Sequence, residues 1–165
     1  MIGLQRIAFG GGCHWCTEAV FQALRGVAQV EQGFVRSTPP HEAYSEAVVV
    51  HFDPGQIGLR DLIEIHLRTH SSTSNHVLRG KYRSAVYALN PKQLSTAQAI
   101  VGELQAGFDA PLVTRVLRLA DFKPSQERFQ NYYRKHQGNQ FCERYIDPKL
   151  QRLRARYARF AAEPS

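Results

Sequence analysis

Three glycines and two cysteines near the start of the chain form the pattern with the clearest chemistry, Gly10-Gly11-Gly12-Cys13-His14-Trp15-Cys16. A short apolar segment precedes the glycines and a helical pattern follows them, so we expect Cys13 at the N-terminus of a helix. Unpaired N–H groups and the positive end of the helix dipole stabilise an anion there. Such settings lower a cysteine pKa from ~8.5 to about 3.5–7.5 and favour the nucleophilic thiolate. We therefore predict that Cys13 is the reactive group; the alternative is a buried structural cysteine.

Cys16 gives this pattern the spacing Cys-x-x-Cys, which thioredoxin-like redox pairs and zinc half-sites share. Only 12 residues precede Cys13, too few for the start of a thioredoxin fold, and no second cysteine or histidine pair completes a zinc site. His66 and His70 lie four positions apart without a neighbouring Glu motif, so we take them as ordinary histidines. We predict no metal site. With Cys142 the chain has three cysteines, which does not suggest a structural disulfide framework.

Length and composition are those of an ordinary globular domain. The chain has 165 residues, of which 43% are hydrophobic and 21% charged, so disorder and fibrous architectures are not expected. No apolar run approaches the ~18 residues that cross a bilayer, and residues 1–9 are too short and too polar for a signal peptide. We expect one cytoplasmic domain over residues 1–165, in which residues 138–165 carry Cys142 and a basic helix.

The net charge of +7 comes largely from the end of the chain, where residues 149–165 hold five basic residues and one acidic residue. Apolar residues recur there at steps of 3, 4 and 3: Leu150, Leu153, Tyr157 and Phe160. This spacing places them on one helical face beside a basic stripe. We predict a docked amphipathic helix with a solvated basic face; the alternative is a helix that binds nucleic acid or a membrane surface. We expect that the protein binds neither nucleic acid nor membranes and that it is a monomer.

Strand and helix patterns alternate without a strict βαβ repeat. Strands are predicted over residues 7–9, 27–35, 43–52, 85–89 and, as the last one, 113–120. Helices are predicted over residues 13–24, 59–67, 91–104, 124–136 and from Pro148 onward, with a loop at Gly138 and Asn139. This order favours an α+β fold, a two-layer sandwich in which helices pack on a mixed or antiparallel sheet with a ferredoxin-like core.

Four segments in the same order resemble one enzyme family. Residues 9–21 resemble the signature of the A-class peptide methionine sulfoxide reductases, whose core is Gly-Cys-Phe-Trp. Residues 44–54 are similar to the family's His-Ala-Glu-Ala-Val segment leading to Phe-Asp-Pro, and residues 81–85 to its Tyr-Arg-Ser motif. Residues 141–150 resemble the C-terminal segment that carries a recycling cysteine in many members. The resemblance therefore covers nearly the whole chain.

The resemblance implies an enzyme of oxidative damage repair that reduces methionine S-sulfoxide, free or in proteins, with thioredoxin as the reductant and no cofactor. A sulfoxide sulfur is a poor electrophile until its oxygen is protonated or strongly hydrogen-bonded. The resemblance assigns the nucleophile to Cys13, the proton donor to Glu46, the contact with the sulfoxide oxygen to the Tyr82 hydroxyl and the methyl pocket to Trp15. Burial of Glu46 in its apolar stretch would favour the neutral, proton-donating form.

Attack by Cys13 would release methionine and leave a sulfenic acid, which a second thiol condenses to a disulfide. The resemblance makes Cys142 the first choice for this thiol, because the segment around Gly138 and Asn139 is expected to be mobile. Cys16 is the competitor, since it lies one helical turn from Cys13. It is also a candidate for a second relay to thioredoxin.

Two residues depart from the family pattern at positions expected to line the substrate site. His14 stands where the family has Phe and introduces a titratable group beside Cys13. Phe34 replaces an active-site tyrosine, which removes one hydroxyl donor. We interpret Cys-His-Trp-Cys as the mark of a divergent subgroup. Two other functions remain open: a general thiol or peroxide-reacting oxidoreductase, and a zinc- or RNA-binding module.

Overall fold

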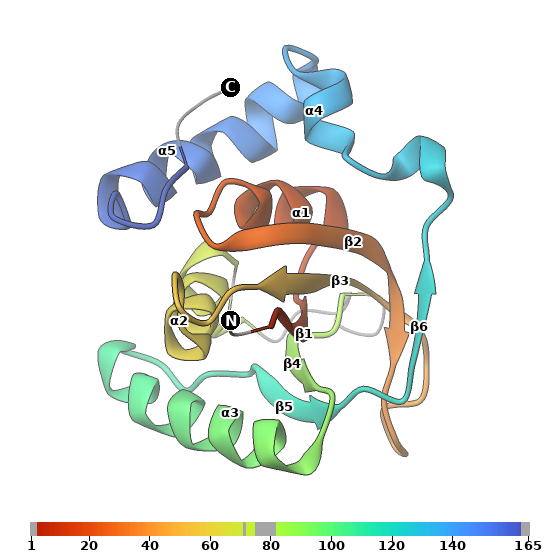
Figure 1. The fold of residues 1–165 in the computed structure, drawn as a ribbon, viewed down its shortest axis with the longest axis vertical. Coiled ribbons are helices and arrows are strands. Elements are labelled where there is room, and N and C mark those ends of the chain that lie inside the picture. Colours follow the sequence, from red (N-terminus) through yellow and green to blue (C-terminus); the bar gives the residue numbers. More distant parts are fainter. Residues whose placement is uncertain (1–2, 71, 75–81, 163–165) are drawn as a thin grey trace.

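Six strands form one mixed sheet in the computed structural model, which describes residues 3–70, 72–74 and 82–162 (Figure 1). The strands are β1 Gln5–Gly10, β2 Val27–Arg36, β3 Ser45–Phe52, β4 Ala85–Ala88, β5 Arg115–Arg118 and β6 Asp121–Pro124. Their order across the sheet is β5-β4-β1-β3-β2-β6. All neighbours are antiparallel except β4 and β5, which run parallel.

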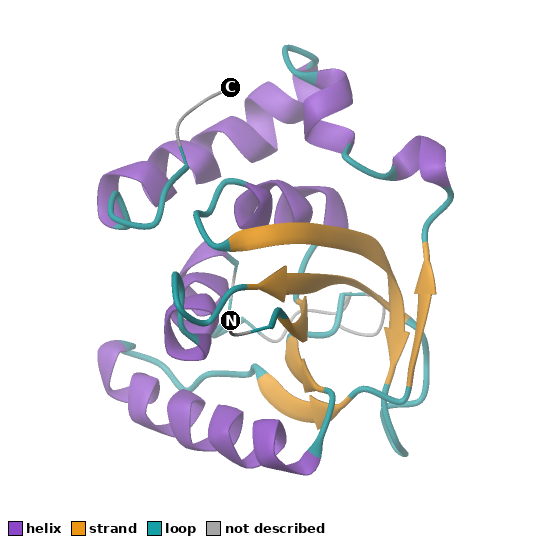
Figure 2. Ribbon diagram, viewed as in Figure 1, coloured by secondary structure: helices purple, strands orange, loops and turns teal. Residues whose placement is uncertain are grey.

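The described residues also form five α-helices. Figure 2 draws the helices in purple. They are α1 His14–Gln22, α2 Leu59–Thr69, α3 Pro91–Leu104, α4 Tyr132–His136 and α5 Asp147–Arg156. Shorter helical segments are η2 Gln105–Gly107, η3 Glu127–Phe129 and the π-helical η4 Cys142–Ile146. No helix within the described ranges combines the length and the apolar character needed to cross a membrane.

The central four strands follow the order β4-β1-β3-β2, with α1 between β1 and β2 and α2 between β3 and β4. This arrangement confirms the predicted α+β fold with a ferredoxin-like core. Side chains alternate along β3, so that Val48, Val50 and Phe52 join the main core with the helices, whereas Ala47 and Val49 join a smaller cluster on the opposite face. The residues of β3 are therefore covered on both faces of the sheet.

The prediction of one helix over residues 124–136 is wrong. The prediction that residues 113–120 contain the last strand is also wrong, because β6 follows them. β6 pairs with β2, opposite Phe34 and Val35. Residues 125–136 then form a 3-10 turn and the five-residue helix α4 in place of one long helix. Asn131 adopts a left-handed conformation (φ 57°), which interrupts any continuous helix. The other predicted strands and helices are present with small differences at their ends.

The end of the chain packs as the apolar spacing predicted. Leu150 and Leu153 of α5 are buried in the main core, whereas Arg152, Arg154 and Arg156 are exposed. The helix begins at Asp147, with Pro148 in its first turn. It continues directly from η4, so Cys142 lies in helical structure.

Candidate active site

A sharp glycine turn joins the buried strand β1 to helix α1 and presents Cys13. Cys13 is the N-cap residue, and its carbonyl accepts hydrogen bonds from the N–H groups of Cys16 (3.1 Å) and Thr17 (3.3 Å). Gly11 has φ +149°, and a Cβ atom there would lie 2.5 Å from the His70 ring. Only glycine fits such a position without backbone strain and without displacing the His70 ring. The turn therefore fixes the Cys13 thiol at the helix N-terminus, half-buried and free of any disulfide.

Helix α2 braces the same turn through its two histidines. The Nε2 atom of His66 donates to the Gly10 carbonyl (2.7 Å), and the Nε2 atom of His70 is 2.7 Å from the Ser84 hydroxyl. The ring of His66 also packs against Phe9, with 4.8 Å between the ring centroids. His66 and His70, which the sequence suggested only as ordinary histidines, thus hold the backbone that precedes the nucleophile.

The three thiols differ in their environment. A hydrogen bond from the Cys16 thiol lowers the pKa of Cys13, and burial raises it. The backbone N–H of Trp15 also lowers this pKa, whereas the charge of Glu46 raises it. The same hydrogen bond raises the pKa of Cys16, as does burial. Burial also raises the pKa of Cys142. These directions support Cys13 as the thiolate and Cys16 as the thiol that donates to it.

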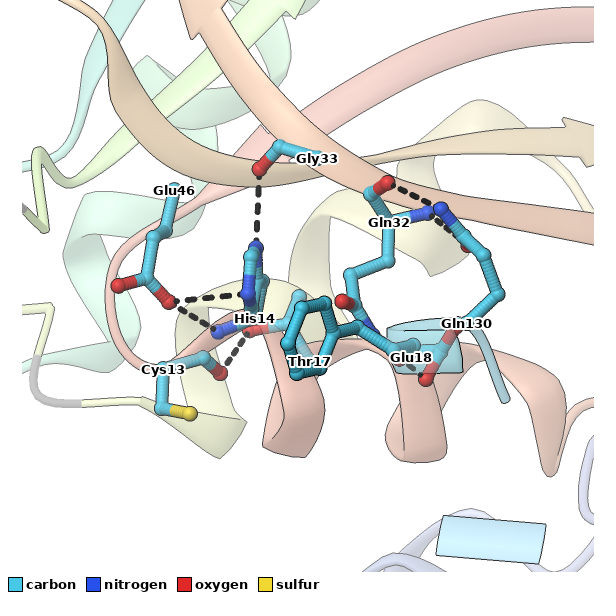
Figure 3. Close-up of polar contacts among 9 residues, drawn as sticks. Cys13, His14, Thr17, Glu18, Gln32, Gly33, Glu46 and Gln130 are labelled. Atoms are coloured by element: carbon cyan, nitrogen blue, oxygen red, sulfur yellow. Dashed lines mark hydrogen bonds and ion pairs between the residues drawn. The ribbon is translucent and has the colours of Figure 1, made fainter. Parts of the chain in front are cut away.

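Glu46 reaches the N-terminus of α1 from the sheet (Figure 3). Glu46 of β3 pairs with Phe34 of β2, so both side chains point to the face that α1 covers. The Glu46 side chain is 9% exposed, and its Oε1 atom accepts a hydrogen bond from the His14 backbone N–H (3.1 Å). The His14 ring lies between them, with its Nε2 atom 3.4 Å from Glu46 Oε1 and its centroid 5.3 Å from that of Phe34. The geometry brings Cys13, His14, Phe34 and Glu46 together.

Trp15 belongs to an aromatic cluster at the first turn of α1. Its ring stacks on Tyr132 at a centroid distance of 4.0 Å and an angle of 2°, and Phe141 meets it edge-on at 5.5 Å. Trp15 is half-buried, as a wall of an apolar pocket would be. Since Phe141 directly precedes Cys142, this cluster also joins the C-terminal segment to α1.

Sequence reasoning missed two residues that build this cluster, Glu18 and Tyr132. Glu18 is fully buried, and its carboxylate accepts hydrogen bonds from the N–H groups of Asn131 and Tyr132 (both 2.9 Å) and from the Gln32 side chain (3.0 Å). Burial raises the pKa of Glu18, and these hydrogen bonds oppose the rise. The sequence did hold a signal for Glu18, because an acidic residue on the buried face of a helix needs polar partners from other segments.

Tyr82 is half-buried and lies in the segment before β4. The next residue, Arg83, donates its backbone N–H to the hydroxyl of Ser45 (2.8 Å), which directly precedes Glu46. The Arg83 guanidinium is fixed in turn by the Tyr87 hydroxyl (2.9 Å). The backbone beside Tyr82 is therefore anchored at the end of β3 that carries the acid. Lys81 of the same motif lies outside the described residues.

Cys142 is fully buried at the start of η4, and the side chain of Asn139 caps its backbone N–H (2.8 Å). It belongs to the main core cluster together with Cys16, against which Cys13 packs. The thiols of Cys16 and Cys142 are close enough for the charge of one to affect the pKa of the other. Over residues 3–70, 72–74 and 82–162, no group of three or more His, Cys, Asp or Glu residues is arranged to hold a metal ion.

Comparisons with known proteins show which family the chain is similar to. A family model described as peptide methionine sulfoxide reductase matches residues 5–161. The chain is 37% identical to a protein of Deinococcus radiodurans named peptide methionine sulfoxide reductase MsrA, over 93% of this chain and 82% of that protein. A protein of the same name from Ralstonia nicotianae is 36% identical over 94% of this chain and 92% of its own length.

Solved structures show the same fold. Methionine sulfoxide reductase A of Corynebacterium diphtheriae superimposes with a TM-score of 0.72 at 24% identity, covering 82% of this chain and 76% of that one. Mxr1 from Saccharomyces cerevisiae in its reduced form gives a TM-score of 0.73 at 20% identity, covering 83% and 88%. Mxr1 in complex with Trx2 gives 0.64 at 22% identity, covering 79% and 85%.

Proposed function

The chain belongs to the peptide methionine sulfoxide reductase family, and we propose that it reduces methionine S-sulfoxide through its Cys13 thiolate. One observation carries this assignment to named residues. A half-buried thiol at a helix N-terminus, with its pKa lowered by the Cys16 thiol, lies beside a buried carboxyl group that reaches the same helix end. Family membership favours this reaction over general thiol or peroxide chemistry.

The reaction needs a nucleophile, a proton for oxygen and a site for the methyl group. The Cys13 sulfur attacks the sulfoxide, the bond between oxygen and the substrate sulfur breaks, and oxygen leaves on Cys13 as a sulfenic acid. The substrate sulfur gains two electrons and the Cys13 sulfur loses two. Glu46 supplies the proton that this oxygen takes up, with the Tyr82 hydroxyl holding the oxygen in place. Trp15 forms the wall against the methyl group, where contact between sulfur and ring contributes about 0.3–1.5 kcal/mol.

A stereospecific assay tests this function. The protein is incubated with dithiothreitol and a peptide that carries one diastereomer of methionine sulfoxide, and each epimer is followed by chromatography. We expect loss of the S epimer and no change in the R epimer. If neither epimer disappears, the reductase function is wrong, and if both disappear at equal rates the methyl pocket does not select the substrate. Free methionine S-sulfoxide in a parallel reaction shows whether the peptide is needed.

We propose Cys16 as the thiol that first condenses with the Cys13 sulfenic acid. The sequence favoured Cys142, and both thiols are buried, but the Cys16 thiol lies one helical turn from Cys13 and lowers the Cys13 pKa through a hydrogen bond. That hydrogen bond and the Cys13 charge both raise the Cys16 pKa, and both effects end once Cys13 is uncharged. The Cys16 proton then leaves with the hydroxyl group as water while the disulfide forms. Cys142 would next take over the disulfide from Cys16, after η4 moves.

The two cysteines are separable by substitution. In Cys142→Ser we expect one full turnover without reductant, a Cys13–Cys16 disulfide in the peptide map, and slow cycling with thioredoxin. In Cys16→Ser the serine hydroxyl still donates to Cys13, so the first turnover should remain, but the sulfenic acid should persist and be trapped by dimedone. If a Cys13–Cys142 disulfide forms in Cys16→Ser as fast as the first disulfide forms in the wild type, Cys142 and not Cys16 is the thiol that condenses with the sulfenic acid.

We propose thioredoxin as the reductant and the cytoplasm as the compartment. Mxr1, which has the same fold, has been crystallised in complex with Trx2. Three cysteines in 165 residues do not suggest the disulfide framework of a secreted domain. We also propose that the motif Cys-His-Trp-Cys at residues 13–16 marks a subgroup of the family in which the residue after the nucleophile is polar.

A further inference from the structure

The His14 ring is held at both nitrogen atoms, although it lies in a buried position directly after the nucleophile. Its Nδ1 atom lies 2.9 Å from the carbonyl oxygen of Gly33, and its Nε2 atom lies 3.4 Å from Glu46 Oε1 (Figure 3). The side chains of His14 and Glu46 are 8% and 9% exposed, so water does not screen this contact. The ring orientation is therefore set by the strands β2 and β3 together.

The hydrogen-bond partners of the ring fix where its protons are. A carbonyl oxygen only accepts, so the Nδ1 atom of His14 carries a hydrogen that it donates to Gly33. A neutral His14 then has a lone pair on Nε2. If Glu46 were ionised as well, this lone pair would face a carboxylate oxygen in a buried site, and the two acceptors would repel each other. The 3.4 Å contact is attractive only when the pair carries one more proton, either on Nε2 or on the carboxyl group.

We propose that His14 and Glu46 share one proton and that His14, as a positioning residue, keeps this proton available to Glu46 for the sulfoxide oxygen. This inference rests on the proposed reductase function. Before the reaction the pair holds the proton, either as a neutral acid beside a neutral imidazole or as a carboxylate beside an imidazolium. Oxygen transfer to Cys13 consumes the proton, which leaves a carboxylate and a neutral imidazole. When thioredoxin reduces the disulfide, the Cys13 thiol loses its proton and the pair takes it up again.

The shared proton also favours the reactive form of Cys13. The charge of Glu46 is one of the causes that raise the Cys13 pKa. With a proton on the pair, the net charge of His14 and Glu46 together is zero, and the thiolate no longer faces an uncompensated carboxylate. The same proton thus serves the nucleophile before the reaction and the leaving oxygen during it.

The test is His14→Asn, because an asparagine amide can still donate to the Gly33 carbonyl but has no second ring nitrogen for Glu46. We expect the single-turnover rate on the S epimer to fall about 10- to 100-fold, with little change in KM. His51→Asn is the matched control. His51 also pairs with a carboxylate, since its Nε2 atom lies 2.6 Å from Glu31 Oε1. This pair lies on the opposite face of the sheet, so the single-turnover rate of His51→Asn should stay at the wild-type value.

A double substitution separates a proton role from packing. If His14 acts through Glu46, His14→Asn should cost nothing further in a Glu46→Gln background, so the double variant should match Glu46→Gln alone. A wild-type rate in His14→Asn, or rate losses that multiply in the double variant, would overturn the inference.

A spectroscopic measurement on the wild-type ring does not depend on the folding of any His14 variant. The ¹⁵N resonance of His14 Nε2 should change in Glu46→Gln and not in Glu31→Gln; no change in Glu46→Gln would also count against the shared proton. If the wild-type protein reduces neither epimer, the proposed function itself fails. If it is active while His14→Asn is unaffected, only the shared proton fails.

Discussion

Substitution of Cys13 by serine is expected to abolish methionine sulfoxide reduction, including the first turnover. A serine hydroxyl is not ionised near neutral pH, and its oxygen cannot take up the sulfoxide oxygen as the Cys13 sulfur does when it is oxidised to a sulfenic acid. The chain holds only two other thiols, and both are buried, with their pKa values raised. Neither is able to replace a half-exposed thiolate. The measurement is the methionine formed per protein from the S epimer in the absence of reductant.

The fold of Cys13→Ser should be intact, because serine is among the preferred residues at a helix N-cap and Cys13 makes no side-chain capping bond of its own. Thermal unfolding should therefore occur at the wild-type temperature or slightly above it. Cys142→Ser is the matched control, since it removes a thiol by the same chemical change and should still form one methionine per protein. Epimer-specific reduction by Cys13→Ser would assign the nucleophile to another group.

The parts of the site that were predictable from the sequence are those fixed by local structure. A buried strand, a glycine turn and an amphipathic helix follow one another between Gln5 and Gln22, so the position of Cys13 at the helix N-terminus depends on neighbours in the chain. The β-branched and aromatic residues of positions 43–52 likewise predicted a strand through Glu46. These signals are short in range, and no distant contact overrides them.

The parts that were not predictable depend on contacts between distant segments. One helix was predicted over residues 124–136, but the pairing of β6 with β2 and the hydrogen bonds that Asn131 and Tyr132 donate to Glu18 determine the structure of this segment. The same holds for His14. Its position after Cys13 predicted a pocket wall, whereas its partners, Gly33 and Glu46, lie 19 and 32 positions away.

Glu46→Gln is expected to slow the chemical step by about 10²- to 10⁴-fold, the usual contribution of a positioned general acid. A glutamine amide still accepts the hydrogen bond from the His14 backbone N–H, so the strand and the helix end should stay in place. It has no proton to give to the sulfoxide oxygen. The measurement is the single-turnover rate on the S epimer, with Glu31→Gln as the control on the opposite face of the sheet, where Glu31 pairs with His51.

Alkylation of Cys13 by iodoacetamide distinguishes loss of the acid from damage to the nucleophile. The charge of Glu46 raises the Cys13 pKa, but the His14–Glu46 pair that holds a proton has no net charge, so Glu46→Gln should not raise that pKa. Glu46→Gln should therefore alkylate at least as fast as the wild type at neutral pH while it reduces sulfoxide far more slowly. A disturbed helix N-terminus would slow both reactions together, and an unchanged rate of reduction would remove Glu46 from the role of acid. Slow reduction together with undiminished alkylation is what a proton donor beside an independent thiolate requires.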